Sequence, residues 1–142
     1  MEAYQPQFSP DGRWIAYTSN ESGTYQIYVV NVPSAAGGSA VPGRWQVSTA
    51  GGQQPRWRAD GKELFFVSQE GEMMSVKINA NAKGLRASTA EPLFSTGIIP
   101  VGPAYRYDVT ADGRRFVLLK TVNGGAAPLK VIVNWSAAFG AQ

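Results

Sequence analysis

The four aspartates of this 142-residue chain are the first candidates for acid–base chemistry, because carboxylates can act in pairs as acid and base. Three of them, Asp11, Asp60 and Asp112, each precede a glycine in a repeated motif, and a turn explains them without a catalytic role. The fourth, Asp108, lies outside these turns and is a candidate for binding. We therefore expect no catalytic residue, which predicts that the chain is not an enzyme.

Other reactive groups are missing from the sequence. It contains no histidine and no cysteine, so a Ser-His-Asp or Cys-His arrangement, a disulfide and a thiolate metal site are all ruled out. It also has no Walker loop, Rossmann fingerprint or zinc motif. The glycine pairs at 37–38, 51–52 and 124–125 are typical of flexible connections. We expect neither a metal nor a cofactor.

The aspartates belong to a motif that occurs three times. Asp11-Gly12, Asp60-Gly61 and Asp112-Gly113 follow one another after about 50 residues, a period that indicates a repeat architecture. An Asp-Gly pair between apolar runs predicts a β-hairpin turn, since glycine accepts positive φ and aspartate tolerates turn conformations. These six residues are therefore expected to have a structural role.

The apolar runs around each turn predict about four short strands in each repeat. The runs Ile15-Ala16-Tyr17, Phe65-Phe66-Val67 and Phe116-Val117-Leu118-Leu119 are nearly continuous, which suits sheets covered on both faces. Four-stranded sheets stacked around an axis form a β-propeller. We predict an all-β fold, a propeller segment of three four-stranded antiparallel blades in one domain, 1–142. The blades span about 4–48, 53–96 and 104–135, and the last lacks its outer strand, as in half of a six-bladed propeller.

The repeats also predict which side chains lie inside. Phe8, Trp57 and the Phe65-Phe66 pair are expected to be buried between blades. The tryptophans Trp14, Trp45, Trp57 and Trp135 and the pair Met73-Met74 are expected to belong to the core.

Gln7, Arg56 and Asp108 occupy matching positions on the inner strands of the three repeats. Inner strands line the channel of a propeller, so these side chains are expected to face a common space, with Arg56 and Asp108 in a salt bridge. Two interpretations remain open. The three residues form a polar contact between blades, or they bind a ligand or peptide.

The first repeat resembles the PD40 (WD40-like) repeat of TolB-type propellers. It has the pattern Pro-x-Phe-Ser-Pro-Asp-Gly-Arg-x-Ile-Ala-Tyr-x-Ser from Pro6, followed by the run at 27–31. The second repeat departs from this motif at Ala59, and the third at Tyr107 and Ala111. The ending Val131-Ile132-Val133-Asn134-Trp135 is similar to the C-terminal end of propellers fused to bacterial eukaryotic-like Ser/Thr kinases, although no kinase motif is present. The resemblance implies a periplasmic or otherwise extracytoplasmic setting in a bacterium.

Taken together, these features predict a non-catalytic binding or scaffold module for protein or peptide partners. It would be the sensor or interaction part of a larger envelope protein or kinase. The alternative is an accessory propeller that gates substrate to a peptidase or other hydrolase domain outside this chain. The net charge of +3 is mild and spread out, which argues against nucleic acid as a partner. No apolar run approaches the ~18 residues of a membrane-spanning helix.

Three blades form an open arc whose end faces have no neighbour, so the chain is also expected to associate. Its partner would be the remaining blades of a parent propeller or, most simply, a second copy that closes a six-bladed ring. The apolar residues expected on the open faces are Ile15, Tyr17, Ile27, Val117, Leu119 and Val131.

Overall fold

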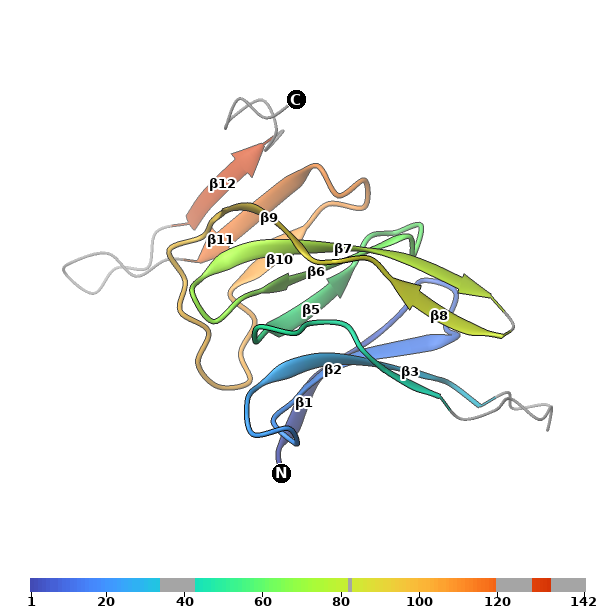
Figure 1. Cartoon of the computed structure of the whole chain (residues 1–142). Helices are drawn as coiled ribbons and strands as arrows, with labels where there is room; N and C mark the ends of the chain where they lie inside the picture. The colour runs from blue at the N-terminus through green and yellow to red at the C-terminus, as the bar shows by residue number, and fades with distance from the viewer. Residues whose placement is uncertain (34–42, 82, 120–128, 134–142) are drawn as a thin grey trace.

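The computed structural model describes residues 1–33, 43–81, 83–119 and 129–133, and this part of the chain forms three antiparallel sheets without a helix (Figure 1). The first sheet contains β1 (Ala3–Phe8), β2 (Trp14–Ser19), β3 (Gln26–Asn31) and β4 (Arg44–Gln46). The second contains β5 (Gln53–Trp57), β6 (Glu63–Val67), β7 (Glu72–Asn81), β8 (Gly84–Ala87) and β9 (Glu91–Ser95). The third contains β10 (Tyr107–Val109), β11 (Arg115–Leu119) and β12 (Leu129–Val133). The predicted all-β fold is confirmed. Within these ranges, no helix is long and apolar enough to cross a membrane.

The three Asp-Gly pairs form the first hairpin turn of each sheet, as predicted. Gly12, Gly61 and Gly113 all have φ of 72°, in the left-handed region that glycine adopts without strain. In each turn the aspartate side chain accepts a hydrogen bond from the backbone N–H two residues later, at 2.9 to 3.0 Å. This local bonding explains why the motif repeats.

The second sheet differs from the prediction of four strands, because it has five. The ten residues of β7 pair with β9 near their start, and from Ile78 to Asn81 they pair with β8. We call the hairpin Ile78–Ala87 the wing. Its turn segment is polar and has no apolar run that would signal a strand, but Leu85 fills the core between the first two sheets. The prediction that the third blade lacks an outer strand concerns residues 134–142, which lie outside the described residues.

The core consists of two clusters, one on each face of the second sheet. Successive residues of β6 alternate between them, since side chains of a strand point to opposite faces. Leu64 and Phe66 belong to the cluster shared with the first sheet, and Phe65 and Val67 to the cluster shared with the third. The middle sheet is therefore covered on both faces, as its continuous apolar run predicted.

The predicted burial holds for some residues and fails for others. Phe65 and Phe66 are each 1% exposed, but Phe8 is 65% exposed, so the prediction for Phe8 was wrong. Trp57 is half-buried and packs against the cluster between the first and second sheets. The residues that match Phe8 pack on the preceding sheet, and no sheet precedes the first one in the described part of the chain.

The other residues that were expected in the core or on an open face also differ in their exposure. Trp14 and Met73 are buried, whereas Trp45 and Met74 are half-buried against the first cluster. Ile27, which was expected on an open face, is fully buried in that cluster, so this expectation was wrong. Of the remaining open-face residues, Leu119 is 43% exposed and Ile15, Tyr17 and Val117 are half-buried. Trp135 and the side chain of Val131 lie outside the described part.

Candidate functional site

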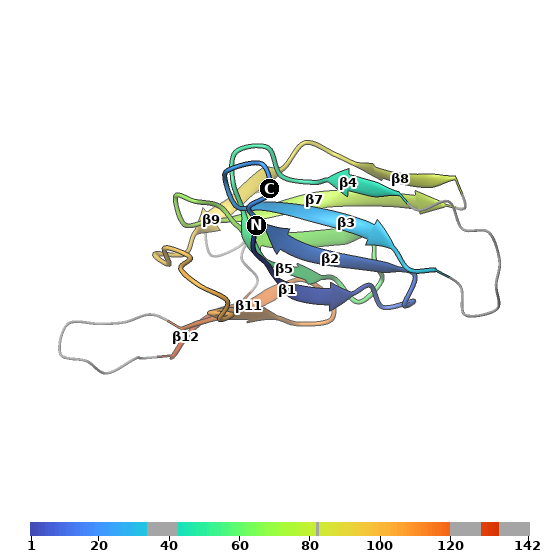
Figure 2. The ribbon, with the colours of Figure 1, turned by 90° about the horizontal axis from the view of Figure 1, so that it is seen from below.

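The inner strands β1 and β5 lie side by side, whereas β4 and β8 lie at the outer edges of their sheets (Figure 2). In the third sheet β10 is the inner strand, and its Tyr107 O accepts a hydrogen bond from Arg56 of β5. A β-bulge interrupts β1 at Gln5 and β5 at Gln54, and these two residues have φ of 61° and 63°. A left-handed conformation costs a residue other than glycine about 1–2 kcal/mol, so neighbouring contacts must hold it. We call Gln5 and Gln54 the bulge glutamines.

Each bulge glutamine reaches the next sheet. Gln5 Oε1 accepts a hydrogen bond from the Gln54 N–H at 2.8 Å, and Gln54 Oε1 accepts one from the Arg106 N–H at 2.8 Å. The residues Gln5 and Gln54 are 5% and 0% exposed. Their Nε2 atoms have no hydrogen-bond partner among the described residues. The same contact therefore joins the first sheet to the second and the second to the third.

Tyr107 of β10 and Tyr105, which lies just before β10, hold the carbonyl groups at the bulges. The Tyr107 hydroxyl donates to Gln54 O at 2.7 Å, and the Tyr105 hydroxyl donates to Pro55 O at 2.8 Å. Burial raises the pKa of both phenols well above the usual value. They therefore stay protonated hydrogen-bond donors at neutral pH and are unsuited to proton transfer there.

The predicted inner-strand residues gather around Tyr105. Arg56 Nη1 lies 3.6 Å from Asp108 Oδ1, so the expected salt bridge is present, and Arg56 Nε donates to Tyr107 O at 3.0 Å. The Arg56 guanidinium also lies 4.1 Å from the centroid of the Tyr105 ring. Gln7 accepts a hydrogen bond through its backbone oxygen from Trp57 Nε1 at 3.0 Å, and its side chain lies beside the Tyr105 hydroxyl. All of these contacts join residues from different parts of the repeat series. The Asp108 side chain also remains 65% exposed to solvent.

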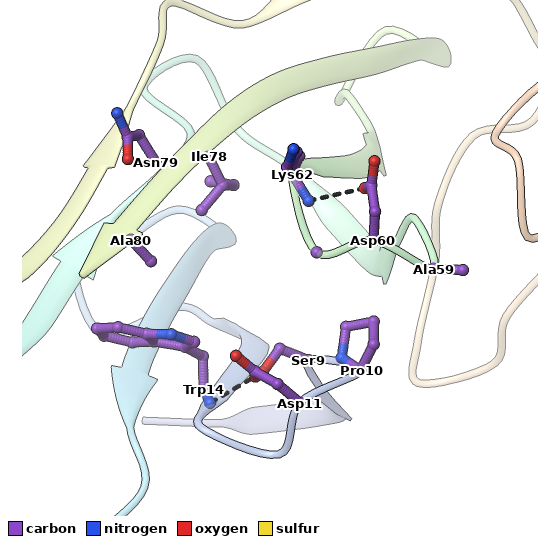
Figure 3. Close-up of a pocket in the computed structure, with 11 residues that line it drawn as sticks. Ser9, Pro10, Asp11, Trp14, Ala59, Asp60, Lys62, Ile78, Asn79 and Ala80 are labelled. Carbon is purple, nitrogen blue, oxygen red and sulfur yellow. Dashed lines mark hydrogen bonds between the residues drawn. The ribbon is translucent and has the colours of Figure 1, made fainter. Parts of the chain in front are cut away.

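A groove of about 750 Å³ opens at the other end of the inner strands, between the first two Asp-Gly turns and the wing (Figure 3). Its lining comes from three segments that are distant in the sequence. The lining residues are Ser9, Pro10, Asp11, Trp14, Ala59, Asp60, Gly61, Lys62, Ile78, Asn79 and Ala80.

The two aspartates of the groove differ in their partners. Arg58 binds Asp60 through two hydrogen bonds, Nε to Oδ1 at 2.9 Å and Nη2 to Oδ2 at 2.7 Å. In the first sheet Ser9 stands where the second has Arg58, and Asp11 Oδ1 accepts from the Ser9 hydroxyl at 2.6 Å. No cation pairs with Asp11, and no carboxylate pairs with Lys62, in the part of the chain that the structure describes. The groove is therefore lined by one carboxylate and one ammonium group that have no salt-bridge partner among the described residues.

A strand edge borders the same groove. Ile78 N–H donates to Lys62 O on the β6 side, whereas the Lys77 carbonyl accepts from Ser88 N–H on the opposite side. Because backbone groups alternate along a strand, the N–H and C=O of Ala80 point to the same side as those of Ile78. β6 begins at Glu63 and does not extend alongside Ala80. These two backbone groups are thus directed toward the groove, above the buried Trp14 and Ile78.

The Arg58–Asp60 pair predicts how stability responds to acid. The Arg58 hydrogen bonds, followed by that of the Lys62 N–H, lower the pKa of Asp60 to about 2. A carboxyl with a lowered folded-state pKa stabilises the fold above its unfolded pKa of about 4, and the contribution disappears as the pH falls toward 2. Since Asp60 is exposed, we expect its contribution to the free energy of unfolding to be less than about 1 kcal/mol.

Urea unfolding of the wild type and of Asp60→Asn is measured from pH 7 to 2.5. The free energy of unfolding of the variant should fall less steeply as the pH is lowered. In an Arg58→Met background this difference should become smaller, because only the Lys62 N–H bond then remains to lower the pKa of Asp60, and a difference of unchanged size would contradict the assignment.

Sequence reasoning found the Arg56–Asp108 pair but missed the bulge glutamines, Tyr105 and the groove. A signal for the glutamines was present, since Gln-Pro occurs at residues 5–6 and again at 54–55, at matching places in the first two repeats. No comparable signal marks the groove, because its residues come together only when the wing folds over the first sheet.

Comparisons with known proteins extend this description. No protein-family model matches the sequence, and no curated protein matches it significantly. Among solved structures, a putative TolB from Agrobacterium tumefaciens superposes with a TM-score of 0.63 at 14% identity, over 95% of this chain and 47% of that one. A putative 6-phosphogluconolactonase from Bacteroides uniformis superposes with a TM-score of 0.60 at 12% identity, over 93% of this chain and 37% of that one. At these identities the likeness concerns the fold alone, and it shows a TolB-like propeller segment. The chain spans less than half the length of either protein.

Proposed function

We propose that the chain is a non-catalytic propeller module that binds an extended peptide or protein segment in the groove between its first two sheets. One observation carries this proposal. The Asp11 carboxylate and the Lys62 ammonium have no salt-bridge partner among the described residues, and both residues line the same groove as the buried side chains of Trp14 and Ile78.

The groove suits a segment of extended backbone. A peptide strand beside the wing would exchange hydrogen bonds with the N–H and C=O of Ala80, as in recognition by β-strand addition. Its basic side chain would face Asp11 and its acidic side chain would face Lys62, and this arrangement would fix its direction. We also propose Gln7, Arg56 and Asp108 as a second contact region, since the Asp108 carboxylate is the most exposed member of that group.

We further propose an extracytoplasmic setting in a bacterium, as part of a larger envelope protein or kinase built with PD40-type repeats. Support for this setting comes from the repeat motif and from the fold likeness to a putative TolB.

The binding proposal is tested with a phage-displayed library of random peptides selected on the purified chain. We expect Asp11→Asn and Lys62→Met each to weaken binding of the selected peptides by roughly fivefold. Asp112→Asn and Arg114→Met change the same turn positions in the third sheet, outside the groove, and should leave affinity unchanged. Hydrogen exchange at the Ala80 amide should slow when peptide is bound. Peptides that bind both groove variants as tightly as the wild type, and protect no amide of the wing, would count against the proposal.

A further inference from the structure

A second pocket lies near the turn of the wing. Its volume is about 460 Å³, which is within the range of sites that bind small ligands. Its lining includes Trp45 of β4 and, from the wing, Asn79, Asn81, Lys83, Gly84 and Arg86. We call it the Trp45 pocket. The Asp-Gly turns that line the groove do not contribute to it, so the two sites are separate.

The strand register of the wing gathers its polar side chains. Asn79 pairs with Arg86, and Asn81 with Gly84, across the two strands. Cross-strand partners share one face of a hairpin, and so do residues two positions apart in a strand. Leu85 belongs to the core between the first two sheets and therefore projects from the other face. The face opposite Leu85 carries both asparagines and the arginine.

Trp45 supplies an aromatic wall whose position is fixed. Its ring meets the Trp14 ring in a T-shaped arrangement, with the centroids 5.4 Å apart. A Cβ atom at Gly43 would clash with the Trp45 ring, and one at Gly84 would lie 3.1 Å from Trp45 Cζ2. The ring thus takes the space that side chains at these two positions would need. Because Gly84 is the cross-strand partner of Asn81, the indole lies beside the polar groups of the wing.

The polar lining offers mainly hydrogen-bond donors. Asn81 Oδ1 accepts from the Lys83 N–H at 2.8 Å, which leaves the Asn81 amide nitrogen to donate. Lys83 adds an ammonium group and Arg86 a guanidinium group, and both residues are exposed. Neither has a salt-bridge partner among the described residues, and no residue of the lining is acidic. Such a pocket is complementary to a ligand that carries negative charge and many acceptor oxygens.

We propose that the Trp45 pocket binds a sugar unit that carries a carboxylate, as found in acidic polysaccharides. The carboxylate pairs with Arg86 and faces Lys83. The apolar face of the sugar ring packs on the Trp45 indole, and the hydroxyl groups exchange hydrogen bonds with Asn79 and Asn81. A plain anion would leave the aromatic wall without a contact, and a neutral sugar would leave both cationic groups without a partner. A sugar with a carboxylate satisfies both parts of the lining.

NMR titration of the isotope-labelled chain tests this proposal with three probes. D-glucuronate is the acidic sugar, D-glucose is its neutral counterpart, and inorganic phosphate is an anion without a sugar ring. We expect glucuronate to cause saturable shifts at the Trp45 indole N–H and the Asn81 side-chain amide, with a dissociation constant of about 1 mM or lower. Glucose and phosphate should each bind at least about tenfold more weakly.

Variants that circular dichroism shows to be folded make the test specific. We expect Arg86→Met and Trp45→Leu each to weaken glucuronate binding by about tenfold or more. Arg86→Lys keeps the charge and should retain a part of the affinity. Arg114→Met removes the same charge at the third Asp-Gly turn, outside the pocket, and should leave glucuronate binding unchanged. If Trp45→Leu does not fold, the comparison of glucuronate with phosphate still tests the part of the aromatic wall.

Several results would overturn the proposal. Equal affinities for glucuronate and glucose would mean that the cationic groups have no part in recognition. Phosphate binding as tight as that of glucuronate would identify a general anion site. Glucuronate binding that persists unchanged in Arg86→Met, or that does not saturate in the wild type, would show that the pocket is not the site.

Discussion

Replacing Phe65 by alanine is expected to lower the free energy of unfolding by about 3–5 kcal/mol. Phe65 is 1% exposed, and its ring meets the Phe116 ring edge-on at a centroid distance of 5.2 Å. Removing it would open a cavity in the cluster that joins the second and third sheets, which cannot fully collapse because strands on both sides hold it open. Since small domains have about 5–15 kcal/mol of stability, this change would remove a large part of it. Equilibrium unfolding in urea measures the difference.

Phe8→Ala provides the control for this prediction. The two residues have the same chemistry, but Phe8 is 65% exposed. We expect its replacement to change stability by less than about 0.5 kcal/mol in the isolated chain. Similar losses for Phe8→Ala and Phe65→Ala would mean that the assignment of inside and outside in these two sheets is wrong.

The elements that could be predicted depend on local chemistry. An Asp-Gly pair specifies a turn through its own side chain and a left-handed glycine, so all three hairpins were predictable from short stretches of sequence. The run Phe65-Phe66-Val67 indicated a sheet covered on both faces, because successive side chains of a strand point to opposite faces and here both sets are apolar. The matching of repeats likewise predicted the approach of Arg56 and Asp108.

The features that were missed depend on neighbours. The sequence around Phe8 resembles the sequence around Trp57, yet the burial of these two side chains differs. In the described structure, only Trp57 has a preceding sheet to pack against. The wing was missed because its turn is polar and its strand pairing is supported by Leu85, whose burial depends on the first sheet. The groove was missed for the same reason, since neither turn alone forms it.

The bulge glutamines lead to the second large effect. Replacing Gln54 by methionine keeps the length and approximate volume of the side chain but removes the acceptor of the Arg106 N–H. A buried donor left without a partner costs about 1–3 kcal/mol. The loss of Nε2, which has no hydrogen-bond partner among the described residues, offsets a part of this cost. We therefore expect Gln54→Met to lower the free energy of unfolding by about 1–2 kcal/mol.

Two further variants make this test specific. Gln5→Met removes the acceptor of the Gln54 N–H in the first interface and also that of the buried Thr18 hydroxyl, at 2.8 and 2.7 Å, so it should cost at least as much. Gln69 is exposed in the turn after β6, and Gln69→Met should change stability by less than about 0.5 kcal/mol. Hydrogen exchange adds a local measurement, since the Arg106 amide should exchange faster in Gln54→Met and the Gln54 amide faster in Gln5→Met. If both amides kept their wild-type rates, the glutamines would not be the groups that hold the three inner strands together.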